Sequence, residues 1–240
     1  MTEQPPLPVE DTIAMYYVAP SRVEMAAAQA MAIAGGLAVA CSRELEPRPE
    51  WEAAFARWRE RSFRKVALRA QADDFAAVAA AHAHVAAPIG ESAILCLAPL
   101  ARSERSEVLA GLRPFTDAKR PDEPEPEPPL SGAMLYVVRD GVMRTAGKAM
   151  AQAGHASLMS WYRHGDANRD AFDAWSEAGC PGVVRVADDV QWRELALRPD
   201  AVVVTDGGLT QVAPGTETVI ALFPGAGTDA AERLAPLERL

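Results

Sequence analysis

The sequence predicts an α/β protein built from two tandem layer domains, each a small mixed β-sheet flanked by helices. Three observations support this fold class: strand-like apolar runs alternate with helical segments, a segment rich in proline and glutamate divides the chain, and the two sides of that segment share a sequence pattern. The dividing segment, "KRPDEPEPEPPLSG", cannot pack a core and is typical of a semi-rigid, solvated spacer. We therefore expect a domain at 12–117, a linker at 118–131 and a second domain at 132–240.

The elements of the second domain follow from its local patterns. Short β-branched and apolar runs predict strands at 133–139, 182–187, 201–206 and 217–224. Alanine-rich or amphipathic stretches predict helices at about 146–163, 168–178 and 190–197, and a last helix that begins near 228. The first domain follows the same order, but its stretch between "DDF" and "GES" is about eight residues shorter. We expect no strand there that corresponds to 201–206.

The shared pattern of the two halves is an internal repeat. "AAAQAMAIAGG" matches "TAGKAMAQAGH" at an offset of 119 residues. Further on, "FARWRE", "KVALRAQADDF" and "GESAILCLAP" match "FDAWSE", "GVVRVADDVQW" and "GTETVIALFP". Four matches in the same order on both sides of the spacer favour a tandem duplication over chance similarity of alanine-rich helices.

Composition and charge leave a broad class of function. The chain has 240 residues, of which 49% are hydrophobic and 24% charged, as in globular proteins that bury a core. No apolar run approaches the roughly 20 residues of a membrane span, and the acidic, proline-rich start is unlike a secretory signal. Three scattered cysteines predict reduced thiols and a cytoplasmic protein, without a disulfide framework or a zinc site. The net charge of −9 argues only weakly against a nucleic-acid partner, because a local basic patch can still exist.

A helical stretch in the second half, "GKAMAQAGHA", carries three chemically competent side chains. At 100° per residue Lys148, Gln152 and His155 lie within about 60° of one another around a helix. A cation, an amide and an imidazole on one face can bind an anion, orient water and move a proton. The alternative is an ordinary solvated helix face.

A second candidate stretch is "TDGGLTQVAPGTET". Asp206 follows a buried strand, and ligands of α/β folds gather at the carboxyl ends of strands. Gly207 and Gly208 allow close backbone approach, while Thr210, Gln211 and Thr216 offer neutral hydrogen-bonding groups. The alternative is a polar hairpin with an Asx turn.

These two motifs together resemble the type II peptidyl-tRNA hydrolase family, whose G-K-x-x-A-Q-x-x-H-A helix and D-x-G-x-T-Q-x-x-x-G-T-x-T-V segment match residues 133–240 nearly end to end. The resemblance implies hydrolysis of the ester that joins a peptide to tRNA, with peptidyl-tRNA as partner and no cofactor or metal. It places functional positions at Lys148, Gln152, His155, Asp206, Thr210, Gln211 and Thr216. The turn before the helix has fewer lysines than in the family, which leaves Arg144 and Lys148 as its cations.

The chemistry of ester hydrolysis suggests a role for each group. A positioned water, a base and stabilisation of the oxyanion suffice, without a covalent nucleophile. Asp206 or His155 is the candidate base, and the residues do not decide between them. Lys148, with a threonine hydroxyl, would stabilise the developing charge or the ribose oxygens, and Gln152 would orient the reacting groups.

The first half keeps the frame but loses these groups, since Lys148, Gln152 and His155 fall on Gln29, Ile33 and Gly36. We expect a degenerate copy that replaces a second subunit, giving a monomeric pseudo-dimer, with a homodimer as the other possibility. The run "RWRERSFRK" could instead contact RNA, although solvated arginines at the end of an amphipathic helix are the favoured interpretation. The competing interpretation of the whole chain is a non-catalytic module that binds tRNA or protein.

Overall fold

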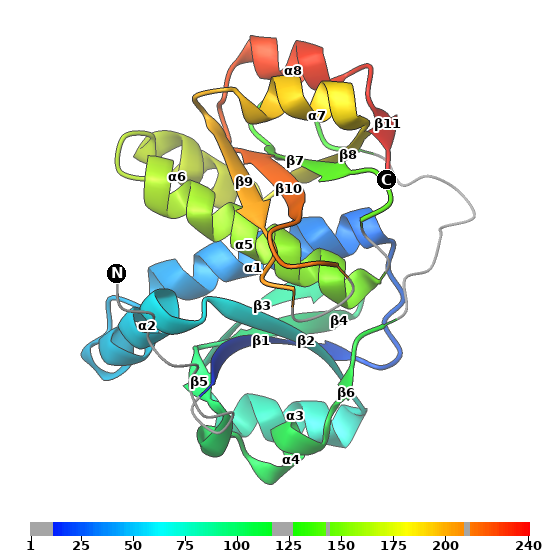
Figure 1. The fold of residues 1–240 in the computed structure, drawn as a ribbon. Helices are drawn as coiled ribbons and strands as arrows, with labels where there is room; N and C mark the ends of the chain where they lie inside the picture. Colours follow the sequence, from blue (N-terminus) through cyan, green and yellow to red (C-terminus); the bar gives the residue numbers. More distant parts are fainter. Residues whose placement is uncertain (1–11, 117–126, 143–144, 209–211) are drawn as a thin grey trace. The chain divides into compact units, whose positions relative to one another are not determined.

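The computed structural model has two β-sheets with helices packed on them, so the α/β class is confirmed (Figure 1). It describes residues 12–116, 127–142, 145–208 and 212–240. The chain divides into two compact units, Met1–Val23 with Cys41–Pro114 (unit 1) and Glu24–Ala40 with Phe115–Leu240 (unit 2). The expected domains at 12–117 and 132–240 stay predictions, and much of the expected linker lies outside the described residues.

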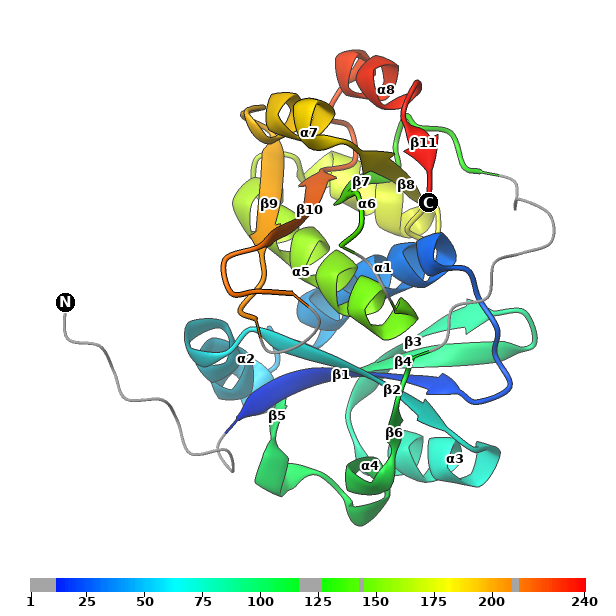
Figure 2. The same cartoon turned by 45° about the vertical axis from the view of Figure 1, so that its right-hand side comes forward.

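Unit 1 is built on a mixed sheet. Its strands and helices are β1 (Ile13–Pro20), α2 (Pro49–Arg61), β2 (Arg64–Ala70), α3 (Ala72–Ala81), β3 (His84–Ile89), β4 (Ser92–Leu97), β5 (Leu100–Ala101), α4 (Glu107–Gly111) and β6 (Arg113–Pro114). The sheet has the order β3-β4-β1-β2-β6, with β5 also paired to β1. β1 and β2 are parallel, whereas β1 with β4 and β3 with β4 are antiparallel. Helices α3 and α4 cover one face of this sheet, where their apolar side chains share a core with β1 (Figure 2).

Unit 2 contains a sheet of the same kind. Its strands and helices are β7 (Met134–Arg139), α5 (Ala146–His164), α6 (Arg169–Glu177), β8 (Gly182–Ala187), α7 (Asp189–Ala196), β9 (Ala201–Thr205), β10 (Glu217–Leu222), α8 (Thr228–Leu234) and β11 (Glu238–Arg239). The order is β11-β8-β7-β10-β9, with β7 and β8 parallel and β10 antiparallel to both neighbours. Helices α7 and α8 cover one face, and α5 packs on the other face against β9 and β10 (Figure 1). All strands and helices predicted for this half from the sequence are confirmed.

Helix α1 (Ala27–Leu45) begins in unit 2 and ends in unit 1. Within unit 2 its glycines allow close packing: a Cβ on Gly35 would lie 1.9 Å from Tyr136 Oη and 2.5 Å from Ser157 Oγ. The Tyr136 hydroxyl and Ser157 Oγ are hydrogen-bonded at 2.7 Å, and burial raises the pKa of Tyr136. A Cβ on Gly36 would similarly lie 2.5 Å from Cys180 Cβ. Small residues at these positions therefore bring α1 against β7 and α5.

The expectation that the first half lacks a strand corresponding to 201–206 is wrong. Residues His84–Ile89 form β3, which pairs with β4 along its whole length. This segment has few β-branched residues, so its strand conformation depends on cross-strand pairing that local sequence does not reveal. His82 and His84, beside and within this strand, are half-buried, and His82 Nε2 lies 3.0 Å from Ser106 Oγ.

The end of the second helix in each half has the same local geometry. In unit 1 the rings of Phe55 and Trp58 meet edge to face at 6.2 Å, and Trp58 Nε1 donates to Arg64 O at 2.8 Å. In unit 2 the corresponding contacts are Phe172 with Trp175 at 6.1 Å, and Trp175 Nε1 to Pro181 O at 2.8 Å. The non-glycine residues with positive φ, among those described, also fall at matching points, Phe63 at 47° and Cys180 at 59°.

The expected spacer is anchored at its C-terminal end. Arg185 of β8 is buried and forms an ion pair with Glu127. Glu127 also forms an ion pair with Arg239 at 3.2 Å. The hydrogen bond from Arg185 holds the pKa of the Glu127 carboxyl below its usual value. The residues that lead into unit 2 are thus tied to its sheet by an ion pair.

Candidate active site

Helix α5 presents two of the expected site residues from its first two turns. The Thr145 hydroxyl caps the helix by accepting a hydrogen bond from Lys148 N at 3.3 Å. Lys148 and Gln152 are four residues apart, so they lie one above the other on the same helix face. Both are buried, since Ala146, Ala149 and Ala153 allow the helix to pack closely on the sheet. The expected convergence of these two residues is present.

Asp206 is held at the carboxyl end of β9 by the backbone of the following loop. Its N–H donates to Thr216 O at 2.8 Å, and its carbonyl accepts from Gly215 N at 2.8 Å. Its Oδ1 accepts a further hydrogen bond from Gly208 N at 2.7 Å, in an Asx turn. Gly208 has φ 73°, a conformation that favours glycine. The Asx turn and the strand-end position that the sequence suggested are therefore both present.

The carboxylate of Asp206 joins the side chains of α5. Its Oδ2 forms a buried ion pair with the Lys148 ammonium. The same oxygen accepts a hydrogen bond from Gln152 Nε2 at 2.6 Å. Both oxygens of this carboxylate are thus occupied by donors. A buried charge pair is tolerated where further hydrogen bonds satisfy its polar atoms, and here they come from Gln152 and Gly208 N. The result is a fixed cation–carboxylate pair at the end of β9.

Thr218 completes this arrangement and was not among the residues singled out in the sequence. It is fully buried on β10, and its Oγ1 lies 2.6 Å from Gln152 Oε1 and 3.2 Å from Val204 O. The hydroxyl donates to the Gln152 oxygen, so the amide is oriented with its Nε2 toward Asp206. Alternation along a strand could not have predicted this contact, because the register of β10 with β9 shifts between Glu217 and Val219.

Thr216 and His155 are the other expected site residues that the structure describes. Thr216 Oγ1 donates to Ala213 O at 2.7 Å, a contact that closes the loop. His155 is half-buried on α5, one turn after Gln152, and contributes none of the hydrogen bonds described above. Arg144, Thr210 and Gln211 lie outside the described residues.

No group of three or more His, Cys, Asp or Glu side chains among the described residues could hold a metal ion. No described helix is long and apolar enough to cross a membrane.

Comparison with known proteins locates the similarity in the second half. The family model of peptidyl-tRNA hydrolase PTH2 matches residues 133–238, which include both motifs. A peptidyl-tRNA hydrolase of Pyrobaculum aerophilum is 37% identical over 99 residues, covering 38% of this chain and 82% of that protein. One from Thermoplasma acidophilum is 36% identical over 97 residues, covering 38% and 83%. The human protein named peptidyl-tRNA hydrolase 2, mitochondrial, is 32% identical over 99 residues, and the match spans 38% of this chain and 55% of that relative.

Proposed function

Because the chain belongs to the peptidyl-tRNA hydrolase PTH2 family through residues 133–238, we propose that it hydrolyses the ester bond between tRNA and a peptide or N-blocked amino acid. The observation that carries this proposal is the buried network of Lys148, Asp206, Gln152 and Thr218. These polar groups occupy the helix and the strand end that the family motifs cover. A solvated helix face would not bury a lysine against a carboxylate.

The proposed mechanism uses water directly. A base removes a proton from water as it attacks the ester carbonyl, and a fixed positive charge stabilises the oxyanion that develops. Lys148 supplies that charge, and Gln152, whose amide is oriented by Thr218, positions the reacting groups. Asp206 or His155 is the base; Asp206 is in contact with Lys148, and His155 lies on the next turn of α5. Thr210, Gln211, Thr216 and Arg144 are proposed to bind the substrate.

We also propose that residues 12–117 are a degenerate copy of the same fold. Read in the same direction, the sheet orders β3-β4-β1-β2-β6 and β9-β10-β7-β8-β11 match strand for strand, with the parallel pair at the same place. Helices α1 and α5 have the same length of 19 residues. The paired Phe–Trp contacts and the two indole hydrogen bonds support the same correspondence.

A pseudo-dimer follows from this duplication. Residues 24–40 belong to unit 2 although they come from the first half of the chain. Gly35 and Gly36 of α1 permit close packing on Tyr136, Ser157 and Cys180, and this packing supports a permanent intramolecular partner. We propose a monomer in solution and keep the cytoplasmic location as a prediction from the sequence.

The test is release of N-acetyl amino acid from acetyl-aminoacyl-tRNA by the purified chain. We expect turnover of the blocked ester and none of unblocked aminoacyl-tRNA, with loss of turnover in Lys148→Ala. A matched control is Arg139→Ala, which removes an exposed cation of the same unit. Retention of tRNA without turnover would overturn the hydrolase proposal in favour of a non-catalytic binding module.

A further inference from the structure

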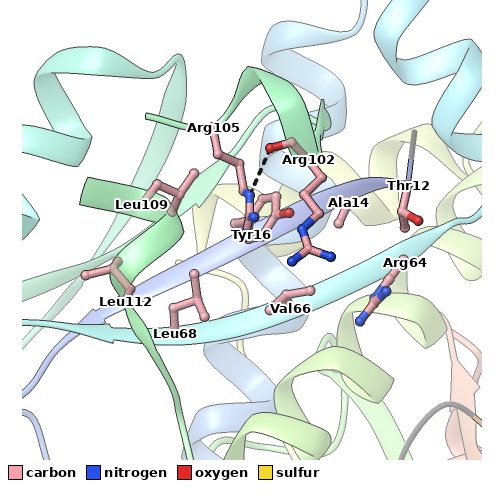
Figure 3. Close-up of a pocket in the computed structure, with 10 residues that line it drawn as sticks. All are labelled: Thr12, Ala14, Tyr16, Arg64, Val66, Leu68, Arg102, Arg105, Leu109 and Leu112. Carbon is pink, nitrogen blue, oxygen red and sulfur yellow. Dashed lines mark hydrogen bonds between the residues drawn. The ribbon is translucent and has the colours of Figure 1, made fainter. Parts of the chain in front are cut away.

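Unit 1 contains a pocket of about 280 Å³ at one end of its sheet. It lies beside β1 and β2, between the strands and the segment that joins β5 to α4, which starts with a 3₁₀ turn at Arg102–Glu104 (Figure 3). Its volume is close to the lower end of the range for small-molecule sites. The pocket is lined entirely by residues of unit 1 and is separate from the Lys148–Asp206 network of unit 2.

Three arginines surround the opening of this pocket. Arg64 is the first residue of β2, and Arg102 and Arg105 come from the 3₁₀ turn and the residue after it (Figure 3). The Nε of Arg105 donates to the backbone oxygen of Arg102 at 3.1 Å, which holds the Arg105 side chain against the 3₁₀ turn. Residues far apart in the sequence thus bring three guanidinium groups to one site.

These arginines have no carboxylate partner among the described residues. The neighbouring acid, Glu104, is engaged elsewhere, because its carboxylate accepts a hydrogen bond from Ala101 N at 2.6 Å. Several arginines of unit 2 are by contrast in ion pairs, for example Arg198 with Asp200 at 2.8 Å. Three unneutralised cations around a concave site form a region of positive potential on a protein whose net charge is −9.

The inner wall combines one hydroxyl with an apolar surface. Tyr16 is buried; burial raises the pKa of its hydroxyl more than the charges of Arg105, Arg64 and Arg102 lower it. The hydroxyl therefore stays protonated at neutral pH and can donate a hydrogen bond to an anion. Leu68 and Leu109 supply apolar wall that can pack against an organic group.

We propose that this pocket binds a phosphate monoester carried on a compact organic body, the chemistry shared by a free mononucleotide and the 5′-phosphorylated end of an RNA strand. A dianionic phosphate satisfies several guanidinium groups at once, since their planar forks match its oxygens, whereas a single carboxylate would leave positive charge unpaired. The organic body packs on the leucine side of the pocket. The proposal concerns unit 1 alone and does not depend on ester hydrolysis by unit 2.

The test is calorimetric titration of the full chain with adenosine 5′-monophosphate at moderate salt. Binding is expected for the monophosphate and not for adenosine. Arg102→Ala and Arg105→Ala are each expected to weaken it about tenfold or more, because each removes charge-assisted hydrogen bonds. Arg57→Ala is the matched control, since Arg57 is exposed on α2 of the same unit and does not line the pocket. Thermal melting verifies that each variant is folded. Arg105→Lys serves as a further variant, because it retains the positive charge but lacks the planar guanidinium that matches the phosphate oxygens.

Two further arms identify the source of the phosphate and its charge. A short RNA with a 5′-phosphate is compared with the same RNA ending in a 5′-hydroxyl: preference for the phosphorylated strand over the mononucleotide assigns the site to an RNA end, and the reverse assigns it to a free nucleotide. Binding is expected to weaken as the pH falls below about 6, where the monoester loses one charge. Equal binding of adenosine, or an equal loss in Arg57→Ala and Arg105→Ala, would overturn the proposal.

Discussion

The two halves differ most clearly in one hairpin. In unit 2, β9 and β10 are connected by residues 206–216, which carry Asp206 and the Asx turn to Gly208. In unit 1, β3 and β4 occupy the same places in the sheet order but pair as far as Ile89 and Ser92, so that Gly90 and Glu91 alone connect them. A strand is therefore present at this place in both sheets, and the connection to the next strand is shorter in unit 1.

The register of the strands shows which residues of unit 1 stand at the places of the polar groups in unit 2. Cys96 faces Tyr17, and Ala221 faces Tyr136, on the central strands. Counted from these residues, the position of Thr218 is held in unit 1 by Ala93, and that of Asp206 by Ile89. The position of Lys148 corresponds to the uncharged Gln29. Unit 1 thus forms a sheet of the same strand order with no charged group at these positions.

Each half also buries one lysine, but against different groups. Lys148 lies against a carboxylate. Lys65 of β2 lies over two aromatic rings, 3.8 Å from the centre of Phe63 and 4.6 Å from that of Trp58, and burial lowers its pKa well below the usual value. The basic run "RWRERSFRK" therefore does not form one surface patch, because its final residue, Lys65, is buried and Arg59 forms an ion pair with Glu46.

Replacing Asp206 should have the largest effect on activity. Asp206→Asn leaves the buried Lys148 without its opposite charge, and we expect kcat/KM for acetyl-aminoacyl-tRNA to fall about a hundredfold or more. Asp189→Asn, an exposed partner of Arg139 in the same unit, should leave the rate within about twofold. Comparable rates for the two variants would contradict the proposed role of Asp206 in catalysis.

A methyl group at Gly35 tests the packing of α1 within unit 2. The added Cβ would meet Tyr136 Oη, so we expect Gly35→Ala to lower the free energy of unfolding by about 2 kcal/mol. Gly111→Ala is the control, because a Cβ there meets nothing within 4 Å. Chemical denaturation of both variants measures the difference, and equal stabilities would exclude the close packing.

Thr218 is proposed as a positioning residue that acts through Gln152. Thr218→Val keeps the shape but removes the hydroxyl, and we expect kcat to fall about tenfold with little change in melting temperature. Thr218→Ser should restore most of the rate. Equal rates for the valine and serine variants would show that orientation of the amide does not matter.

The smallest effect concerns the pH dependence of stability at Lys65. Because its folded pKa lies below the unfolded value of 10.5, the unfolded chain binds the extra proton between these two values. The free energy of unfolding should therefore rise with pH in this window, by at most about 1.4 kcal/mol per pH unit, and fall as the pH is lowered. Lys65→Met should lose this slope, so its stability relative to the natural chain should decline from pH 7 to 10. A constant difference would contradict the pKa shift.

Local patterns predicted the second half well, because its β-branched strands and capped helices are each specified by nearby residues. The helix predicted at 146–163 is Ala146–His164, and the strand predicted at 201–206 is Ala201–Thr205. Strand β3 and the short edge strands were missed because cross-strand pairing, and not local composition, makes them extended.

The site was predictable only where spacing along one element suffices. Lys148 and Gln152 follow from helical periodicity and Asp206 from its place after a strand. The contact of Thr218 with Gln152 joins residues 66 positions apart, and the pocket of Arg64, Arg102 and Arg105 also forms only in the folded sheet. Neither could be read from a local motif.

The most direct test of the account compares matched positions of the two halves. Lys148 corresponds to Gln29 at the offset of 119 residues, so Lys148→Ala and Gln29→Ala are measured for release of N-acetyl amino acid from acetyl-aminoacyl-tRNA. The account predicts that Lys148→Ala abolishes turnover and that Gln29→Ala leaves it unchanged. Full turnover in Lys148→Ala, or equal loss in both variants, would contradict an active site confined to the second half.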